Sequence, residues 1–471
     1  MKQYFFLSIL ILFSGCLVGP NYRSPEVCVS DEWHAPESIL AEPDCNWWEL
    51  FNDDLLVKYI NLAAHHNYDL LKAEANIWQA RSLLQVTASD LFPHVGADLD
   101  GLRTYFSKNG PIGIFEGLGK AKIPPAINIY NALIDATWEI DIFGKTRRNI
   151  ESSKARVESY IEERNALLLS IFAEVAMNYV HIRGTQERIQ LIEKNISLLE
   201  QNMKIANTQV STGYSNKLNL VQIEAQLSLA KGALPDLYAQ TFKLIYALSI
   251  LTGNLPETFL TELLPEKALP NPPIDVTVGL RSDLLRRRPD VLMAERNLAA
   301  ATASIGVAVA SFFPSFNLIG LSGFQSLHLN NLFESKSLAW AILGDINIPI
   351  FQGGKLIGNL RASEAAAASA VANYQQTVLH ALEETEGALI SYEQELAARK
   401  NLQNAADHYD QFASITRERF QKGLVSMTDY LDAERQLISS ELTLLDSKTS
   451  VLLDLIALYK ALAGPFCFDE T

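Results

Sequence analysis

The sequence predicts a mainly helical protein in which long antiparallel helical hairpins accompany four β-strands of a membrane barrel. Two regions without proline, 126–234 and 350–464, predict the long helices, because proline breaks a helix interior. Two stretches in which apolar and polar residues alternate, within 95–142 and 315–350, predict the strands. An internal duplication indicates that these elements form two similar halves.

Composition limits the class of protein. Among 471 residues, 39 Lys and Arg face 54 Asp and Glu, which gives a net charge of −15. A chain this acidic lacks the basic face that nucleic-acid binding requires. Its mean hydropathy of +0.06 is too low for a transporter with many spanning helices. The 48% of hydrophobic residues excludes wholesale disorder.

The amino terminus reads as an export signal. Lys2 precedes a short apolar run, so residues 1–15 are predicted to be a signal peptide. Ser14–Gly15 before Cys16 resembles a bacterial lipobox, which predicts acylation of Cys16 with chains such as palmitate and a lipid-anchored segment over 16–50. The alternative is a plain signal peptide with a chance cysteine. Export also leaves two alternatives for the other cysteines, a Cys28–Cys45 disulfide or free thiols at 28, 45 and 467.

The duplication defines the predicted domains. Asp69, Phe92 and Pro93 recur as Asp290, Phe313 and Pro314 at an offset of 221, and further matches follow at an offset of 210. We therefore expect a first repeat over 51–260, a linker over 261–279, a second repeat over 280–464 and a tail over 465–471. Each repeat contains a helix, a β-hairpin (94–143 and 314–351) and a long helical hairpin (145–252 and 355–463).

The predicted long helices carry a coiled-coil pattern. Apolar residues from Ile189 to Val210 are spaced alternately by three and four, and the pattern resumes from Leu220 to Leu237. Core packing within a helical hairpin accounts for nearly all of these residues.

The predicted strands have one apolar and one acidic face. From 134 to 142, apolar side chains alternate with acidic and hydroxyl ones, and Trp138 is one of the apolar set. This pattern fits a transmembrane barrel with lipid outside and water inside; a soluble sheet lying on a core would also alternate. One chain supplies four strands, which cannot close around water, so several copies must share a barrel. The residues alone leave two, three or four copies open.

Enzyme motifs are missing from the sequence. It contains no HExxH, GxSxG or CxxC, and no Cys/His spacing typical of a metal site. Gly117–Ala121 is a near match to a phosphate loop, but Ile114 replaces the first glycine and Ala121 the magnesium-binding hydroxyl. We therefore expect no catalytic residue, no cofactor and no resident metal.

A series of motifs carries a family resemblance over almost the whole chain. In order they are Val18–Tyr22, Trp47–Trp48, Asn67–Leu70, Trp138–Gly144, Arg281–Asp290, Ile348–Gly354 and Leu458–Leu462. Together they resemble the TolC-like outer-membrane efflux proteins, in particular the lipid-anchored branch of RND-type tripartite systems. Asn21 stands where that branch more often has aspartate.

The resemblance implies a homotrimer with a twelve-stranded barrel in the outer membrane of a Gram-negative bacterium and a helical α-barrel in the periplasm. Such a protein is a passive exit duct for drugs or other small molecules, in contact with outer-membrane lipid. Its implied partners are a periplasmic adaptor and an inner-membrane pump. The alternatives are a duct for protein secretion and a periplasmic coiled-coil scaffold without a pore.

The resemblance also assigns roles to the two helix turns. Adaptor docking is expected at Gly213, Tyr214 and Ser215 and at Gly423, Leu424, Val425 and Ser426. The alternative is that both are plain turns, which glycine suits. Val425 occupies a position where some members of the family have an arginine that links neighbouring helices.

Asp429 and Asp432 match the aspartates of the family's periplasmic constriction. Rings of such carboxylates attract cations. The corresponding residues of the first repeat, Asn219 and Gln222, are neutral, so an acidic gate would belong to the second repeat. The alternative is a solvated acidic helix face.

The acidic residues of the first hairpin are expected to face the barrel lumen and keep it wet: Asp98, Asp100, Asp135, Glu139 and Asp141. The segment 106–126 is expected to be an external loop. The basic run Arg286–Arg288 is expected to form structural ion pairs rather than to bind anions.

Overall fold

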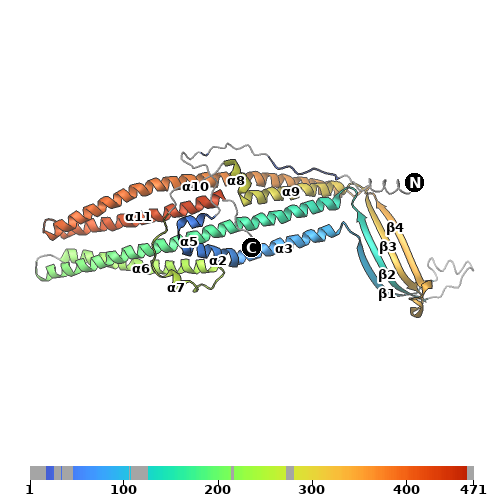
Figure 1. Cartoon of the computed structure of the whole chain (residues 1–471), viewed down its shortest axis with the longest axis horizontal. Helices are drawn as coiled ribbons and strands as arrows, with labels where there is room; N and C mark the ends of the chain where they lie inside the picture. The colour runs from blue at the N-terminus through green and yellow to red at the C-terminus, as the bar shows by residue number, and fades with distance from the viewer. Residues whose placement is uncertain are drawn as a thin grey trace, which may run out of the picture. The chain divides into compact units, whose positions relative to one another are not determined.

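The computed structural model describes residues 17–25, 33, 46–105, 107, 126–213, 217–271 and 281–463. The first half of the chain contains η1 (Trp47–Phe51), α2 (Asp54–His66), α3 (Tyr68–Ser89), β1 (His94–Tyr105), β2 (Ala126–Ile140), α5 (Lys145–Ser211), α6 (Lys217–Leu251) and α7 (Leu260–Leu263). The second contains α8 (Arg281–Arg287), α9 (Pro289–Ala310), β3 (Ser315–Ser326), η2 (Leu329–Asn331), η3 (Ser335–Ser337), β4 (Leu338–Asn347), α10 (Lys355–Gln421) and α11 (Met427–Leu462) (Figure 1).

The chain divides into two compact units, and each draws on both repeats. The sheet unit comprises Met1–Pro25, Ile77–Ser159 and Glu295–Asn373. The helical unit comprises Glu26–Asn76, Tyr160–Ala294 and Tyr374–Thr471.

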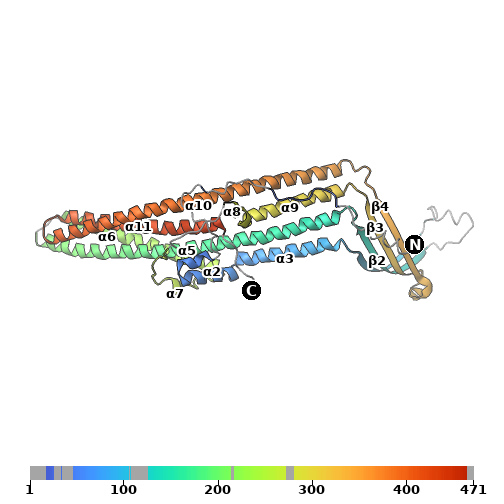
Figure 2. The same ribbon diagram turned by 45° about the horizontal axis from the view of Figure 1, so that its top comes forward.

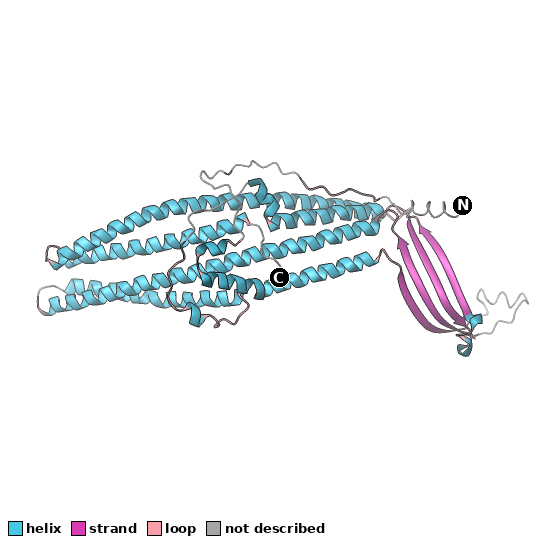
Figure 3. Cartoon of the chain, in the orientation of Figure 1, coloured by secondary structure: helices cyan, strands magenta, loops and turns pink. Residues whose placement is uncertain are grey.

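The sheet unit contains one antiparallel sheet of four strands in the order β1-β2-β3-β4 (Figure 3). His94 of β1 lies opposite Thr137 of β2, and Phe316 of β3 lies opposite Ile346 of β4. The strands have 12, 15, 12 and 10 residues, long enough to cross a hydrocarbon layer, which takes about 9–11 residues of tilted strand. Among the described strands, β1 and β4 each have a single neighbour, so both outer edges are open.

The long helices agree with the proline-free regions. α5 and α10 each have 67 residues, about 100 Å at a rise of about 1.5 Å per residue. Each begins after a glycine in the left-handed region, Gly144 and Gly354. α5 is long and apolar enough to cross a membrane, but half of that apolar window is buried within the fold, as in a core helix. Figure 2 shows α6 alongside α5 and α11 alongside α10.

Two apolar clusters hold the helical unit together. The larger is rich in aromatic rings, and Trp47 of η1 stacks on Tyr459 of α11 with 5.3 Å between ring centroids. The smaller lies towards the helix turns, where Ile196 and Leu199 of α5 pack with Ile223 of α6 and Leu431 of α11. This second cluster contains most of the predicted heptad residues, which confirms that they are core. Ile189 is buried outside it, and Val210 is half-buried. The mainly helical fold with a four-stranded sheet is also confirmed.

Arg288 ties three helices of this unit together. Its guanidinium makes two hydrogen bonds to Asp290 at the start of α9, at 3.0 and 2.8 Å. It also bonds Glu384 of α10 at 2.6 Å and the carbonyl of Ala461 in α11 at 2.9 Å. These contacts agree with structural ion pairing at this end of the basic run.

Candidate functional site

One face of the sheet gathers the acidic side chains of β1 and β2. Residues directly opposite each other in an antiparallel pair share a face, and Asp135 lies opposite Gly96 while Asp100 lies opposite Asn131. Asp98 and Glu139 follow on the same face by the period of two. The register therefore brings together the four acids of the first hairpin that lie in strands.

Polar side chains continue this face across the sheet. The side-chain amide of Asn131 donates to Asp100 at 2.9 Å, and that of Gln325 donates to the oxygen of Asn131 at 2.9 Å. Asn317 donates to Asp345 at 3.4 Å. Apart from Asp100, none of these partners was among the candidate residues from sequence, because the register between strands is not readable there. On β3 and β4 the face is less polar and includes Leu321.

The opposite face of the sheet is apolar and uncovered. Four large side chains on it, two of them on β4, are 57–80% exposed: Leu99, Ile134, Trp340 and Ile342. A sheet that is polar on one side and presents an aromatic and aliphatic surface on the other is typical of a barrel wall between water and lipid.

Asp141 differs from the other predicted lumen residues. β2 ends at Ile140, and the carboxylate of Asp141 accepts hydrogen bonds from the backbone N–H of Arg147 at 2.9 Å and from its Nε at 3.2 Å. A carboxylate at a helix start satisfies free N–H groups there. Asp141 thus stabilises the beginning of α5 and lies outside the sheet.

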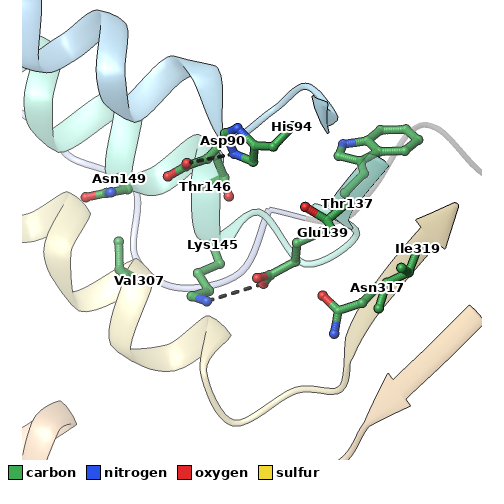
Figure 4. Close-up of a pocket in the computed structure, with 11 residues that line it drawn as sticks. Asp90, His94, Thr137, Glu139, Lys145, Thr146, Asn149, Val307, Asn317 and Ile319 are labelled. Atoms are coloured by element: carbon green, nitrogen blue, oxygen red, sulfur yellow. Dashed lines mark hydrogen bonds and ion pairs between the residues drawn. The ribbon is translucent and has the colours of Figure 1, made fainter. Parts of the chain in front are cut away.

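A pocket of about 410 Å³ lies where this polar face meets the helices (Figure 4). We call it the helix-side pocket. It holds two acid–base pairs, Glu139–Lys145 at 3.3 Å and Asp90–His94 at 3.6 Å. Its lining is completed by Thr137 and Trp138 of β2, Thr146 and Asn149 of α5, Val307 of α9, and Asn317 and Ile319 of β3.

The segment after the predicted anchor is held against the start of α5. We call Leu17–Tyr22 the strap. The guanidinium of Arg148, 1% exposed, donates to the carbonyls of Val18 and Gly19 at 3.1 and 3.2 Å and to the side-chain oxygen of Asn21 at 2.7 Å. Cys16 itself lies outside the described residues.

Both predicted turn glycines have left-handed backbones, with φ of 78° at Gly213 and 70° at Gly423. At the second turn, the N–H of Gly423 donates to Phe420 and that of Leu424 to Arg419, both at 2.9 Å, the pattern of a Schellman cap. The side chain of Leu424 is 66% exposed, Val425 is half-buried and Ser426 is exposed. Tyr214 and Ser215 lie outside the described residues.

The two candidate constriction aspartates have different local partners. Asp429 forms a capping box with Ser426, which is the N-cap residue of α11. The backbone N–H of each residue donates to the side chain of the other at 3.1 Å. Asp432 accepts from Gln436 at 2.7 Å and from Arg435. The hydrogen bond from Arg435 holds the pKa of Asp432 below its usual range.

A half-buried ion pair lies next to these residues. Glu434, 5% exposed, accepts two hydrogen bonds from Arg417 at 2.9 Å each, which join α10 to α11. Phe420 and Tyr430 stack across the same two helices with 4.8 Å between ring centroids. In the part of the chain that the structure describes, no group of three or more His, Cys, Asp or Glu could hold a metal ion.

Comparison with known proteins decides the family. The sequence model described as "Outer membrane efflux protein" matches residues 59–254 and 280–464, most of the chain. This chain belongs to the outer membrane efflux protein family. It is accordingly an efflux channel component of the Gram-negative outer membrane.

Named relatives of this outer membrane efflux protein match it from end to end. The probable efflux pump outer membrane protein SepC of Pseudomonas putida is 27% identical over 98% of this chain and 96% of its own length. Outer membrane protein OprJ of Pseudomonas aeruginosa is 26% identical over 97% of this chain and 95% of its own length.

Solved channels of similar fold match equally fully. The outer-membrane channel OprN is 28% identical, with a TM-score of 0.89, over 96% of this chain and all of that one. The Campylobacter jejuni CmeC outer membrane channel is 25% identical, with a TM-score of 0.87, over 96% of each chain. The outer membrane efflux protein described here therefore has the TolC-like channel fold that its motifs predict.

Proposed function

We propose that three copies of this chain close one twelve-stranded barrel and act together as the passive exit duct of a tripartite pump, with no catalytic activity of their own. The sheet carries the proposal. Its apolar face is exposed, its other face is polar, and the edges of β1 and β4 are open. Lipid does not tolerate open strand edges, and four strands cannot enclose water. Three copies in a ring supply twelve strands and close every edge.

The proposed partners are a periplasmic adaptor and an inner-membrane pump that supplies the energy. We assign adaptor docking to the two helix turns, Gly213–Ser215 and Gly423–Ser426. The exposed side chain of Leu424 supports this, because an apolar side chain at a helix tip gains by being covered.

The proposed cargo is drugs or other small molecules. TtgF of Pseudomonas putida, 27% identical over 98% of this chain, is described as a toluene efflux pump outer membrane protein. ArpC of Pseudomonas putida, 28% identical over 98% of this chain, is described as an antibiotic efflux pump outer membrane protein.

Within this duct, Asp429 and Asp432 are the proposed periplasmic constriction. Three copies would place six carboxylates around the axis, which attract cations and repel anions. The proposed lumen wall comprises the in-strand acids Asp98, Asp100, Asp135 and Glu139. Asp141 is omitted from it because its carboxylate is engaged at the start of α5.

Acylation of Cys16 completes the proposal. The strap that follows this cysteine is fixed beside the helix-side end of the sheet by the hydrogen bond from Arg148 to Val18. Acyl chains on Cys16 would then lie close to the level at which the barrel meets the membrane, where they can enter the same leaflet.

Single-channel conductance in a planar bilayer tests the duct and the constriction together. We expect a small cation-selective conductance from wild type, and a larger or less selective one from Asp429→Asn combined with Asp432→Asn. Asp410→Asn, which neutralises an exposed acid of α10, serves as the control and should leave both quantities unchanged. An unchanged double variant would refute the constriction but keep the duct. Absence of conductance from folded protein would refute the duct and favour a periplasmic scaffold.

A further inference from the structure

The helix-side pocket has the size and lining of a ligand site. Its volume of about 410 Å³ lies within the range of about 300–1,000 Å³ that is usual for small-molecule sites. Thr137, Glu139 and Asn317 reach it from the polar face of the sheet, and Lys145 and Asn149 reach it from the first turns of α5 (Figure 4). It therefore opens on the face that the proposed function assigns to the lumen.

The charges in the pocket are paired but weakly held. Glu139 and Lys145 are 3.3 Å apart, with side chains 41% and 48% exposed, and Asp90 and His94 are more exposed still. Exposed ion pairs contribute only about 0–1 kcal/mol. A bound solute can therefore displace such a partner at little cost.

The pairing favours one charge type of solute. A purely cationic solute that binds Glu139 displaces Lys145 and leaves its ammonium without a partner. A purely anionic solute that binds Lys145 leaves the carboxylate of Glu139 in the same position. A solute that carries both an ammonium and a carboxylate replaces both partners and leaves neither unpaired, and the amides of Asn149 and Asn317 remain available to its polar groups.

We propose that the helix-side pocket is a transit subsite for drug-sized zwitterions, in which Glu139 receives the solute's ammonium and Lys145 its carboxylate. The proposal rests on the proposed function for its place on the export path, and on the pocket alone for its chemistry. The polar lining and exposed pairs give weak binding, which suits a path that solutes must leave as readily as they enter.

Equilibrium dialysis against detergent-solubilised full-length protein tests the proposal without any need for conductance. The probes are three fluorescent compounds with one ring system: ciprofloxacin, a zwitterion at neutral pH; its ethyl ester, a cation; and its N-acetyl derivative, an anion. Wild type should bind ciprofloxacin about three- to fivefold more tightly than either derivative, the range that one exposed ion pair provides.

Two variants should change this ranking in opposite ways. Lys145→Gln removes the carboxylate partner and should bind the ethyl ester at least as well as ciprofloxacin. Glu139→Gln should do the same for the N-acetyl derivative. The matched control is Asp345→Asn, which removes an acidic charge from the same face of the sheet but outside the pocket. Its amide oxygen can still accept the hydrogen bond from Asn317. It should keep the wild-type ranking.

Three outcomes overturn the subsite: equal binding of all three probes by wild type, a ranking that neither pocket variant changes, or an equal change in Asp345→Asn. The last would assign the effect to the general field of the acidic face. The thermal unfolding midpoint of each variant confirms that it is folded. Failure of the proposed function, by contrast, appears as absence of conductance, which dialysis does not measure.

Discussion

Asn21 accepts a hydrogen bond of 2.7 Å from the guanidinium of Arg148, a contact that joins the strap to the first turn of α5 across 127 positions of the chain. Arg148 is almost fully buried, and its ion pair is with Glu151, one turn along α5, at 2.7 Å. The strap side chain that contacts this buried cation is therefore a neutral amide. The resemblance identified this position as one where aspartate is more common.

Asn21→Asp should stabilise the strap. A carboxylate in place of the amide makes the hydrogen bond from Arg148 ionic on both sides, worth about 1 kcal/mol more than the neutral contact. Thermal unfolding of the solubilised protein should show a higher midpoint for Asn21→Asp and a lower one for Asn21→Ala. A loss of stability in Asn21→Asp would mean that Glu151 already satisfies the charge of Arg148.

The free energy of unfolding should depend on pH through the ionisation of Asp53. Burial alone raises its pKa, but hydrogen bonds from Lys267 at 2.7 Å and Tyr179 at 2.8 Å outweigh burial and hold the pKa below its ordinary value of 3.8. A lowered pKa in the folded state means stability that is present above the ordinary value and is lost as the pH falls through the lowered one. Asp53 also caps α2 through the N–H of Leu55.

We therefore expect Asp53→Asn to cost about 2–3 kcal/mol at neutral pH, because the hydrogen bonds from Lys267 and Tyr179 lose their ionised acceptor. The difference from wild type should shrink as the pH falls below 4. Urea unfolding at neutral and acid pH measures both effects. Asp54→Asn, at the exposed neighbour, is the matched control. A cost that does not change with pH would assign the effect to packing instead of charge.

Asp454 should make the free energy of unfolding depend on pH in the opposite direction. Burial and the nearby charge of Glu395 raise its pKa, while Glu395 accepts a hydrogen bond from Ser447 at 2.6 Å. A raised pKa means that the folded state favours the protonated form, so stability is lost as the pH rises through the raised value. Asp454→Asn should therefore stabilise the protein at neutral pH by a few tenths to about 1 kcal/mol. The gain should vanish below the ordinary pKa of aspartate, and thermal unfolding across this range would show it; a gain that persists in acid would contradict the electrostatic cause.

Gly253 and Gly423 provide a matched pair of helix ends. Both have left-handed backbones, with φ of 72° and 70°, and both close a Schellman cap. A Cβ on Gly253 would lie 2.2 Å from the carbonyl oxygen of His66, whereas one on Gly423 would meet nothing within 4 Å. Gly423→Ala should cost about 1–2 kcal/mol, the conformational penalty alone.

Gly253→Ala should cost clearly more, because the backbone of α2 must also move. Denaturant unfolding of both variants separates the cost of the left-handed backbone from the cost of the steric contact with His66. Equal costs would show that the contact at His66 relaxes freely.

How far the sequence predicts this fold depends on the range of the interactions involved. The absence of proline and the heptad spacing are local, and α5 begins at Lys145, the expected start of the first helical hairpin, and ends at Ser211, just before the expected turn at Gly213. Alternation is also local, and it placed Asp98 and Asp135 in strands. Asp141 continues the same alternation but lies beyond β2, because its carboxylate binds Arg147 and begins the helix. The alternation therefore predicted a strand position for Asp141, whereas the local contact with Arg147 places this residue at the start of α5.

The contacts that the sequence did not predict join distant segments. The bond between Gln325 and Asn131 spans 194 positions, and the register of β2 against β3 that creates it is set by pairing between the two repeats. The hydrogen bonds from Arg148 to the strap correspond to no periodic pattern in the sequence. One missed role was readable: Ser426 followed three residues later by Asp429 is the pattern of a capping box, so this aspartate has a structural role besides any at the constriction.

The last prediction concerns Arg435, which pairs with Asp432 on the same face of α11. This contact lowers the pKa of Asp432, so the carboxylate stays ionised, but the guanidinium also offsets much of its charge. If Asp432 forms part of the proposed constriction, Arg435→Gln removes three positive charges from the trimer and leaves the carboxylates in place. Cation selectivity in a planar bilayer should therefore rise, while Asp432→Asn lowers it.

Arg435→Gln combined with Asp432→Asn should bring cation selectivity back towards that of wild type, because the paired positions carry no net charge in either protein. The nearby cation Arg417 is a control of a different kind. It binds buried Glu434, although its own side chain is 43% exposed, so Arg417→Gln should lower stability by about 1–3 kcal/mol, more than it alters selectivity. Equal selectivity in wild type and Arg435→Gln would place Asp432 away from the ion path, and the capping-box residue Asp429 would then be the remaining candidate for the acidic ring.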